Sequence, residues 1–475
     1  MLIIATFMCI PMFIALHEGF VSGEYNSFKS FLYSIILIII FSGTMFLINK
    51  NRKIDFLSYR DGFMFVTLSW VTASFFGGLP FYFSGAMPNF ADAYFETMSG
   101  FTTTGASILT SIETLPHSLL FWRSLTHWLG GMGIVVLTVA ILPILGIGGL
   151  QLIKAEAPGP SMDKITPRIT ETAKYLWLIY LSMTIIETAL LMFGGMDLFN
   201  ALTHTFGTLA TGGFSPKNSS VGHFDSAYIH VVITVFMVMA GVNFSLYYKI
   251  LSGKAVSVFK DNELRAYLVI FLIFTTLIAI NLNSFSVYNI PRSFQFASFQ
   301  VASILTTTGY ATANFENWPH VAQILLFLLM FIGGCSGSTG GGIKVIRIIT
   351  LFKKGLNEMK YLLHPSGVFA LKVGKANIRK DIAYSISAFF FLYIMMLLVT
   401  TFIVATSDVD IVTSLTTALA TVGNIGPGFG LIGPSDNYNF YPDYVKWFLS
   451  FAMMVGRLEL YTVLVLFSPV FWKNK

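Results

Sequence analysis

Charge is scarce in this sequence. Only 11% of its 475 residues are Asp, Glu, Lys or Arg, whereas 55% are hydrophobic, and the mean hydropathy is +0.72. A soluble protein carries about 25% charged residues. The apolar residues come in runs of about 20, the length that crosses a hydrocarbon core as a helix. The composition therefore excludes a soluble globular chain and indicates an integral membrane protein.

Cysteine and reactive motifs are also scarce. The two cysteines, Cys9 and Cys335, lie far apart and form neither a disulfide framework nor a metal-ligand spacing. The eight histidines contain no HExxH pattern, and neither a serine nucleophile elbow nor a phosphate-binding GxxxxGK[ST] loop occurs. We therefore expect no enzyme activity and no covalently bound cofactor.

The few charges are distributed unevenly. Most lysines and arginines fall within residues 50–60, 154–174, 249–265, 344–380 and 473–475, whereas the intervening loops carry mainly acids. Loops rich in Lys and Arg lie on the cytoplasmic side of a membrane. We therefore expect both termini to be cytoplasmic. The net charge of +6 then reflects membrane topology and contact with lipid, and no nucleic-acid partner is expected.

Four short segments of the chain resemble one another. They are residues 102–106 (TTTGA), 209–213 (LATGG), 306–310 (TTTGY) and 420–424 (ATVGN), spaced by roughly a hundred residues. A half-apolar stretch too short to cross a membrane precedes each segment, and an apolar run lies on either side. The expected unit is a span, a short helix, a Thr-Gly loop and a second span.

The expected fold is an all-α polytopic membrane protein in which four M1–P-loop–M2 repeats surround a pseudo-fourfold pore. Two extra N-terminal transmembrane helices, near 1–18 and 30–49, precede the repeats. The paired spans are expected near 62–85 and 118–150, 174–195 and 226–251, 264–283 and 319–351, and 381–406 and 443–470. The domains are 1–55 for the N-terminal helices and then 56–155, 156–255, 256–360 and 361–475 for the repeats, the third with a broken second span.

The Thr-Gly loops suit a cation pathway. Irregular backbone within a bilayer must be buried in protein or line water, so the loops are expected to converge on a pore. Their carbonyl and hydroxyl oxygens can replace the hydration shell of K⁺, toward which the negative C-terminal ends of the short helices point. Asp92, Asp197 and Asp410 stand where helix N-caps are wanted. The predicted K⁺-binding and selectivity-filter residues are Thr103, Thr104, Gly105, Ala210, Thr211, Gly212, Thr307, Thr308, Gly309, Thr421, Val422 and Gly423.

A glycine-rich run interrupts the predicted span at 319–351. So much glycine does not form a stable helix, and we expect a loop just below the filter that acts as a gate. A hinge without a gating role is the alternative. Lys344 either joins this loop or extends to the cytoplasmic surface. The predicted gate residues are Gly333, Gly334, Ser336, Gly337, Ser338, Thr339, Gly340, Gly341, Gly342, Lys344 and Arg457.

Charged residues inside the predicted spans need a reason, because an arginine at mid-helix costs at least about 2.5–3.5 kcal/mol on insertion. Arg457 is expected to hold the glycine-rich loop through its carbonyls, to form a positive barrier in the pore, or to pair with Glu459. Arg123 and His127 are expected near the external interface, where they brace the filter rather than contact the ion. Glu187 receives no role.

Several of these segments resemble the Trk/Ktr/HKT superfamily of potassium transporters, and the resemblance covers nearly the whole chain. The two extra N-terminal spans favour the Trk branch over the Ktr branch, which lacks them. The segments are FTTTGA at 101–106, WRSLTHWLGG at 122–131, ATGGF at 210–214, the glycine-rich run with Ile-Lys at 333–344, and GRLE at 456–459.

The resemblance implies potassium-selective uptake across a bacterial cytoplasmic (inner) membrane. Gly105, Gly212, Gly309 and Gly423 would be the filter glycines, and Arg457 the pore arginine beside the gate. The protein would form a homodimer with one pore per subunit. It would also bind cytosolic TrkA-like nucleotide-binding (RCK) subunits, and any nucleotide control would come from them, since the chain has no Rossmann unit of its own.

Two alternatives stay open. The first is a sodium-permeable transporter, or a symporter that couples K⁺ to Na⁺ or H⁺. A serine in place of the first filter glycine would have favoured sodium, and glycine stands at all four predicted positions. The second is an alternating-access carrier, which predicts two inverted repeats instead of four parallel ones. Because the second and fourth loops lack the triple threonine, the filter should discriminate less sharply than a fourfold one.

Overall fold

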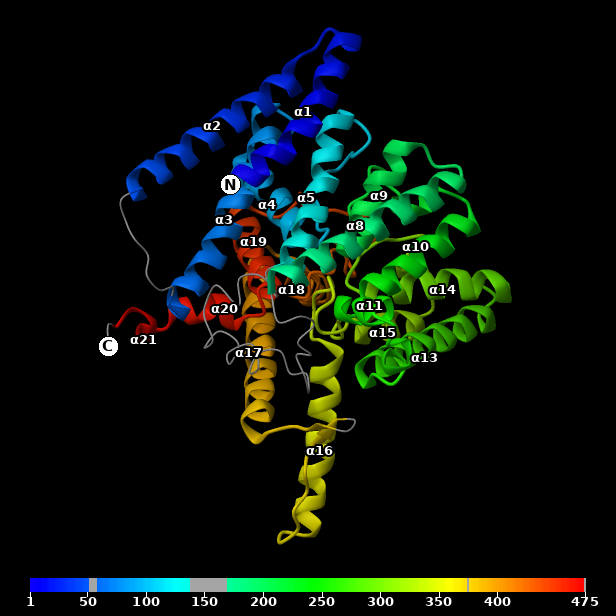
Figure 1. Ribbon diagram of the computed structural model, residues 1–475. Coiled ribbons are helices and arrows are strands. Elements are labelled where there is room, and N and C mark those ends of the chain that lie inside the picture. The colour runs from blue at the N-terminus through cyan, green and yellow to red at the C-terminus, as the bar shows by residue number, and fades with distance from the viewer. Residues whose placement is uncertain (51–57, 137–168, 374–375, 474–475) are drawn as a thin grey trace.

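The computed structural model describes residues 1–50, 58–136, 169–373 and 376–473, and almost all of this part is helical (Figure 1). Its only strands form a two-residue antiparallel hairpin, β1 (Lys372–Val373) and β2 (Ala376–Asn377). Within these residues, six helices are long and apolar enough to cross a membrane. They are α1 (Leu2–Ser22), α2 (Asn26–Asn49), α3 (Tyr59–Phe83), α8 (Ile169–Phe193), α13 (Asn262–Ser284) and α17 (Lys380–Ala405).

Two bent helix pairs raise this number to eight if each pair is one span. The first pair, α10 (Ala227–Ala240) and α11 (Phe244–Leu251), bends by 94°, and its second helix begins at the side-chain cap of Asn243. The second pair is α19 (Asp443–Arg457) with the segment Tyr461–Phe467, which contains α20 (Tyr461–Leu464) and η4 (Val465–Phe467), and it bends by 116°. The spans predicted at 226–251 and 443–470 are therefore found as bent helix pairs, broken at 241–243 and 458–460.

The remaining two predicted spans take different forms. The span expected at 118–150 begins as α5 (His117–Val136), and its continuation lies outside the described residues, as do the expected domain boundaries near 55 and 155. The span expected at 319–351 is broken, as predicted, into α15 (His320–Leu329) and α16 (Val345–Leu363). Short connecting helices complete the chain: η2 (Ser220–His223), α12 (Ala255–Val258), η3 (Phe315–Asn317) and α21 (Pro469–Trp472).

Four short helices precede the Thr-Gly loops, as predicted: α4 (Phe90–Phe101), α9 (Leu198–Ala210), α14 (Ile290–Leu305) and α18 (Ile411–Val422). Asp197 and Asp410 cap α9 and α18, which confirms two of the predicted N-caps. The prediction of Asp92 as the cap of α4 was wrong, because the amide side chain of Asn89 occupies that position. Asp92 lies in the first turn instead, where its carboxylate accepts a bond of 2.6 Å from the buried Lys446 ammonium.

The short helices lie at the centre of the helix packing. Each packs against the helix before it and the helix after it in the chain. In addition, α4 packs against α19, α9 against α5, and α14 against α10, so that successive units of the chain interlock. The pair α1 and α2 lies at one end of the molecule, and α16 extends from the opposite end beside α17 (Figure 1).

Candidate functional site

The chain makes the same turn after each of the four short helices. A non-glycine residue with left-handed backbone comes first: Thr103 (φ 51°), Thr211 (55°), Thr307 (61°) and Asn424 (54°). A left-handed glycine follows two positions later: Gly105 (φ 80°), Gly213 (80°), Gly309 (82°) and Gly426 (95°). The N–H between them donates to a carbonyl five residues back, at 2.9, 2.8, 2.8 and 2.8 Å in the four loops. These backbone angles and hydrogen bonds define one turn that occurs four times.

This turn corrects the predicted register of two loops. The sequence aligned Gly212 and Gly423 with Gly105, but the left-handed glycines are Gly213 and Gly426, one and three residues further on. Gly423 has φ −79° and only caps α18, while the predicted filter residues Thr421 and Val422 lie inside that helix. The first and third loops have the predicted register.

The four glycines form a closed ring of close backbone contacts. A Cβ on Gly105 would collide with the carbonyl oxygen of Gly212, and one on Gly213 with that of Thr308. A Cβ on Gly309 would collide with the Ile425 carbonyl, and one on Gly426 would lie 2.6 Å from the Thr104 carbonyl. Each loop thus packs against the next, and the fourth against the first. Side chains are excluded at all four positions by both backbone angle and space.

The glycine-rich segment lies directly against these loops. It leaves α15, returns to α16, and is closed at its base by a bond of 2.9 Å from the Gly333 N–H to the Ile343 carbonyl. Inside it, the Gly341 N–H donates to the Thr307 hydroxyl at 2.7 Å, and the Thr339 carbonyl accepts from the Thr211 hydroxyl at 2.8 Å. The part of the segment at Thr339 and Gly341 therefore lies against the second and third Thr-Gly loops, and a Cβ on Gly341 would also meet the Gly423 carbonyl before the fourth.

Two basic side chains hold the same segment. Arg457, at the end of α19, donates from Nη1 to the Thr339 carbonyl at 2.6 Å, and the Lys344 ammonium donates to the carbonyl of Gly340. Lys344 is buried, so it joins the loop rather than extending to a surface. Glu459 forms its ion pair with Arg347 of α16, at 2.5 Å, and not with Arg457. Of the three roles considered for Arg457, the geometry supports the contact with the loop, through the Thr339 carbonyl.

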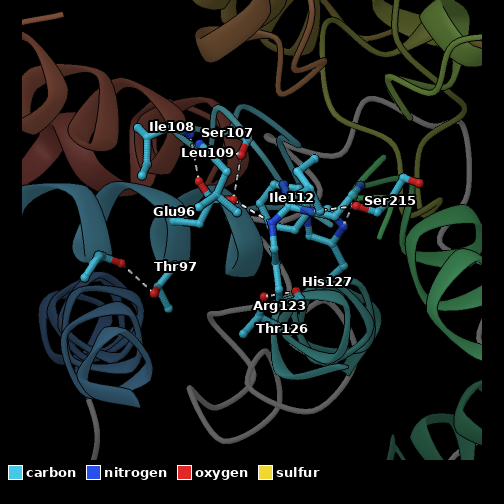
Figure 2. A network of polar contacts seen from close by, with 12 residues as sticks. Glu96, Thr97, Ser107, Ile108, Leu109, Ile112, Arg123, Thr126, His127 and Ser215 are labelled. Carbon is cyan, nitrogen blue, oxygen red and sulfur yellow. Dashed lines mark hydrogen bonds and ion pairs between the residues drawn. The ribbon is translucent and has the colours of Figure 1, made fainter. Parts of the chain in front are cut away.

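A buried ion pair links the segments that directly follow the first two Thr-Gly loops (Figure 2). Arg123 of α5 donates to Glu96 of α4 at 2.6 Å, and both side chains are buried. Glu96 also accepts from the Ser107 hydroxyl and the Ile108 N–H, each at 2.9 Å, just after the first loop. Arg123 donates to the Ser215 carbonyl, just after the second loop, at 3.0 Å.

The second loop is also held by aromatic contacts. Phe214, which follows Gly213, lies between the Arg123 guanidinium, 3.5 Å from its ring centre, and the His127 ring, stacked at 4.0 Å. Arg123 and His127 are buried and both contact Phe214 of the second loop, while their place near the external interface stays a prediction. Glu96 was missed as a functional residue because its partner lies 27 residues away, and only its recurrence as a polar position hinted at a role.

Glu187, for which the sequence suggested no role, lies fully buried in α8. We assign it no part in the site, since none of the hydrogen bonds and ion pairs described above involves it.

Known proteins resemble this chain over nearly its full length. Residues 27–474 match the family TrkH, cation transport protein. The Trk system potassium uptake protein TrkH of Escherichia coli K12 is 43% identical over 90% of this chain and 88% of its own. TrkG of the same organism is 34% identical over 98% and 95%. The crystal structure of the potassium transporter TrkH from Vibrio parahaemolyticus matches with a TM-score of 0.87 and 36% identity, covering 99% of this chain and 98% of that one.

These similarities agree with the helical, multi-span architecture and extend across all four Thr-Gly loops and the glycine-rich segment. The chain belongs to the TrkH family of cation transport proteins.

Proposed function

We propose that this chain takes up potassium across a bacterial cytoplasmic membrane through a gated pore formed by four repeats. The repeats are 56–155, 156–255, 256–360 and 361–475, preceded by the N-terminal helices of 1–55. The observation that carries this proposal is the closed ring of glycine contacts, in which every loop packs against the next. Four equivalent loops in a cycle surround an axis, and an axis lined by carbonyls is a pathway for a cation.

The chemistry of the ring suits a monovalent cation. The short helices end at the ring, and their C-termini carry roughly half a negative charge each, which favours a cation there. No acidic side chain stands at the turn positions of the four loops, so an ion meets oxygen dipoles rather than full charges and can leave again. The buried Thr103 hydroxyl and the Asn424 side-chain oxygen have no hydrogen-bond partner among the described residues, and both are suitable cation ligands.

The potassium ligands of this proposal follow the corrected register. They are the carbonyls and side-chain oxygens of residues 102–105, 210–213, 306–309 and 423–426. K⁺ is the transported substrate here and not a resident cofactor. Thr421 and Val422 are no longer proposed as ligands, because their backbone is helical.

The glycine-rich segment serves as the gate. It lies against the loop ends, and Arg457 and Lys344 place two positive charges on its carbonyls. A cation that passes the ring meets this plug, so conduction requires the segment to move. The hydrogen bonds to Thr211 and Thr307 keep it in the obstructing position.

Orientation and partners follow from the charges and the family. The basic loops lie in the cytoplasm, with both termini, as the positive-inside rule requires. Relatives named as Trk system proteins belong to multi-component systems. We propose that this chain forms a homodimer and binds cytosolic TrkA-like nucleotide-binding (RCK) subunits that move the gate.

Ion uptake into liposomes that contain the purified protein tests the proposal. We compare K⁺, Rb⁺, Na⁺ and Li⁺ for the wild type, Arg457→Ala and Gly309→Ala. Uptake of K⁺ and Rb⁺ well above Na⁺, raised by Arg457→Ala and made unselective by Gly309→Ala, is the expected result. Equal Na⁺ uptake in the wild type would favour the sodium-permeable alternative, and uptake only with an imposed Na⁺ or H⁺ gradient would favour a symporter.

A further inference from the structure

We propose that Glu263 is a positioning residue that holds the glycine-rich loop in place and couples it to α16. This inference rests on the proposed role of the loop as a gate. Glu263 is half-buried in the first turn of α13, a helix that contacts α16 but contributes nothing to the ring of Thr-Gly loops. Among the described residues it is the side chain that bonds to backbone on both sides of the loop–helix junction.

One oxygen of Glu263 makes both contacts. Its Oε1 accepts from the Ser336 N–H at 2.7 Å, inside the loop, and from the Ile346 N–H at 3.2 Å, in the first turn of α16. Hydrogen bonds to an ionised carboxylate are roughly twice as strong as those between neutral groups. The carboxylate also lies at the positive N-terminal end of α16, which favours a negative charge.

The helix α16 needs this carboxylate because its own sequence offers no cap. The N-cap residue is Lys344, whose side chain makes no capping bond and carries only donors. Its ammonium is already bound to the Gly340 carbonyl. Glu263 therefore supplies from another helix the acceptor that Ser, Thr, Asp or Asn usually provides at this position.

This arrangement links two movements. The helix α16 extends away from the rest of the molecule at the end opposite α1 and α2, where a cytosolic partner can reach it (Figure 1). A shift of α16 changes the hydrogen bond between the Ile346 N–H and Glu263. Because the same oxygen accepts from the Ser336 N–H, the shift also changes the contact that holds the loop. Asp261 caps α13 through the Leu264 N–H at 2.9 Å, which holds the first turn of the helix that carries Glu263.

Loss of Glu263 should loosen the loop without unfolding it, because other bonds remain. The Cys335 N–H still donates to the Gly241 carbonyl at 2.9 Å, and the Phe244 N–H donates to the Gly337 carbonyl at 3.1 Å. The chain also contains a natural reporter. Cys335, next to Ser336, is 1% exposed, and Cys9 is the only other cysteine, so a Cys9→Ser background leaves a single thiol in the loop.

The experiment measures two quantities in liposomes: the rate at which N-ethylmaleimide labels Cys335, and the uptake of K⁺ and Na⁺. Glu263→Ala removes the acceptor, and Glu263→Gln keeps an oxygen but not the charge. Asp261→Asn is the matched control, because it removes a charge two residues away and keeps an equally good N-cap. Each variant must first elute as the wild type does in size-exclusion chromatography.

We expect Cys335 labelling and K⁺ uptake to rise by about tenfold in Glu263→Ala, the effect of losing the charge-assisted bond that holds the loop at the Ser336 N–H, and by less in Glu263→Gln. The K⁺/Na⁺ ratio and the Asp261→Asn control should match the wild type. Unchanged labelling, or equal labelling in Asp261→Asn, would overturn the role of Glu263. Faster labelling without increased uptake would overturn the coupling to conduction. Equal uptake of K⁺ and Na⁺ in the wild type and in every variant would instead overturn the proposed selective pore.

Discussion

Replacing Gly426 with alanine distinguishes the two possible registers of the fourth loop. Gly426 has φ 95°, and a left-handed backbone costs a residue with a Cβ roughly 1–2 kcal/mol, or about 5–30-fold in the population of the native loop. The added Cβ would also lie 2.6 Å from the Thr104 carbonyl oxygen and 3.0 Å from the Gly105 carbonyl carbon. These are backbone atoms of the first loop, so relief requires the ring itself to distort.

Gly423 is the matched comparison, because the sequence alone aligned it with the other filter glycines. Its φ of −79° is allowed for alanine, and the equivalent positions of the other loops are Thr102, Ala210 and Thr306. A Cβ there would press on the Leu419 carbonyl of its own helix, at 2.6 Å, and on the flexible Ile425 side chain. The strain stays within the fourth loop and does not reach the neighbouring one.

The assay is uptake of K⁺ and Na⁺ by cells that lack other potassium uptake systems, with the variant amounts matched by immunoblot. We expect Gly426→Ala to lose most of the K⁺/Na⁺ preference and Gly423→Ala to keep it. Gly213→Ala should behave like Gly426→Ala, since it has φ 80° and faces the Thr308 carbonyl. If Gly423→Ala loses the preference, alone or equally with Gly426→Ala, the register argued from the backbone is refuted.

Three further predictions concern contacts around the ring. Glu96→Gln leaves the buried Arg123 charge without its partner, so the free energy of unfolding in detergent should fall by about 3–5 kcal/mol. Asp410→Ala removes the cap of α18 and should cost about 1 kcal/mol. The Thr413 N–H holds the pKa of Asp410 below its usual value. The cap therefore stabilises the protein fully above the pKa that Asp410 has in the unfolded state, and this stabilisation is lost as the pH falls through the lower pKa of the folded state. Thermal melting across pH 2–6 measures the loss. Arg457→Ala removes the donor to the loop carbonyl and should raise K⁺ uptake into liposomes.

Each of these has its own control. The pair Arg379 and Asp381 is exposed, so Asp381→Asn should change the unfolding free energy by no more than about 1 kcal/mol. If Glu96→Gln lowers the free energy of unfolding no more than Asp381→Asn does, the buried ion pair contributes no more to stability than the exposed one. Asp410→Asn keeps the cap, and a loss as large as that of Asp410→Ala would contradict the capping argument. Unchanged uptake in Arg457→Lys and Arg457→Ala alike would exclude a hold on the loop.

The spans were predictable because membrane thickness and apolar length set them. Spans expected at 264–283 and 381–406 are found as α13 (Asn262–Ser284) and α17 (Lys380–Ala405). The bend between α10 and α11 was not predictable in this way. It places the Gly241 carbonyl where the Cys335 N–H binds it at 2.9 Å, and this partner is almost a hundred residues away in the chain. The local hydropathy pattern predicts the length of a helix, but it does not predict the long-range contacts at which a helix breaks.

The candidate site was predictable in its composition but not in its register. Aligning the Thr-Gly pairs selects the first glycine after a threonine or valine, which gives Gly212 and Gly423. Glycine is physically required where the backbone is left-handed and the neighbouring loop leaves no room for a Cβ. In the second and fourth loops these positions are Gly213 and Gly426. In the second loop the residue after the glycine held a usable signal, because Gly213-Phe214 matches Gly309-Tyr310 once the second glycine is chosen.

Hydrogen bonds from the glycine-rich segment reach two of the four turns, and a further bond joins the fourth turn to the first. The first turn position is Thr103, Thr211, Thr307 and Asn424 in the four loops. The glycine-rich segment uses the hydroxyls of Thr211 and Thr307, one as donor and one as acceptor. Asn424 donates its amide to the Thr104 hydroxyl at 2.9 Å, joining the fourth loop to the first. Thr103 carries the same hydroxyl, which has no partner among the described residues, so the position of the segment and not the type of turn residue decides which loops it bonds. The segment cannot leave without releasing two threonine hydroxyls at the ring.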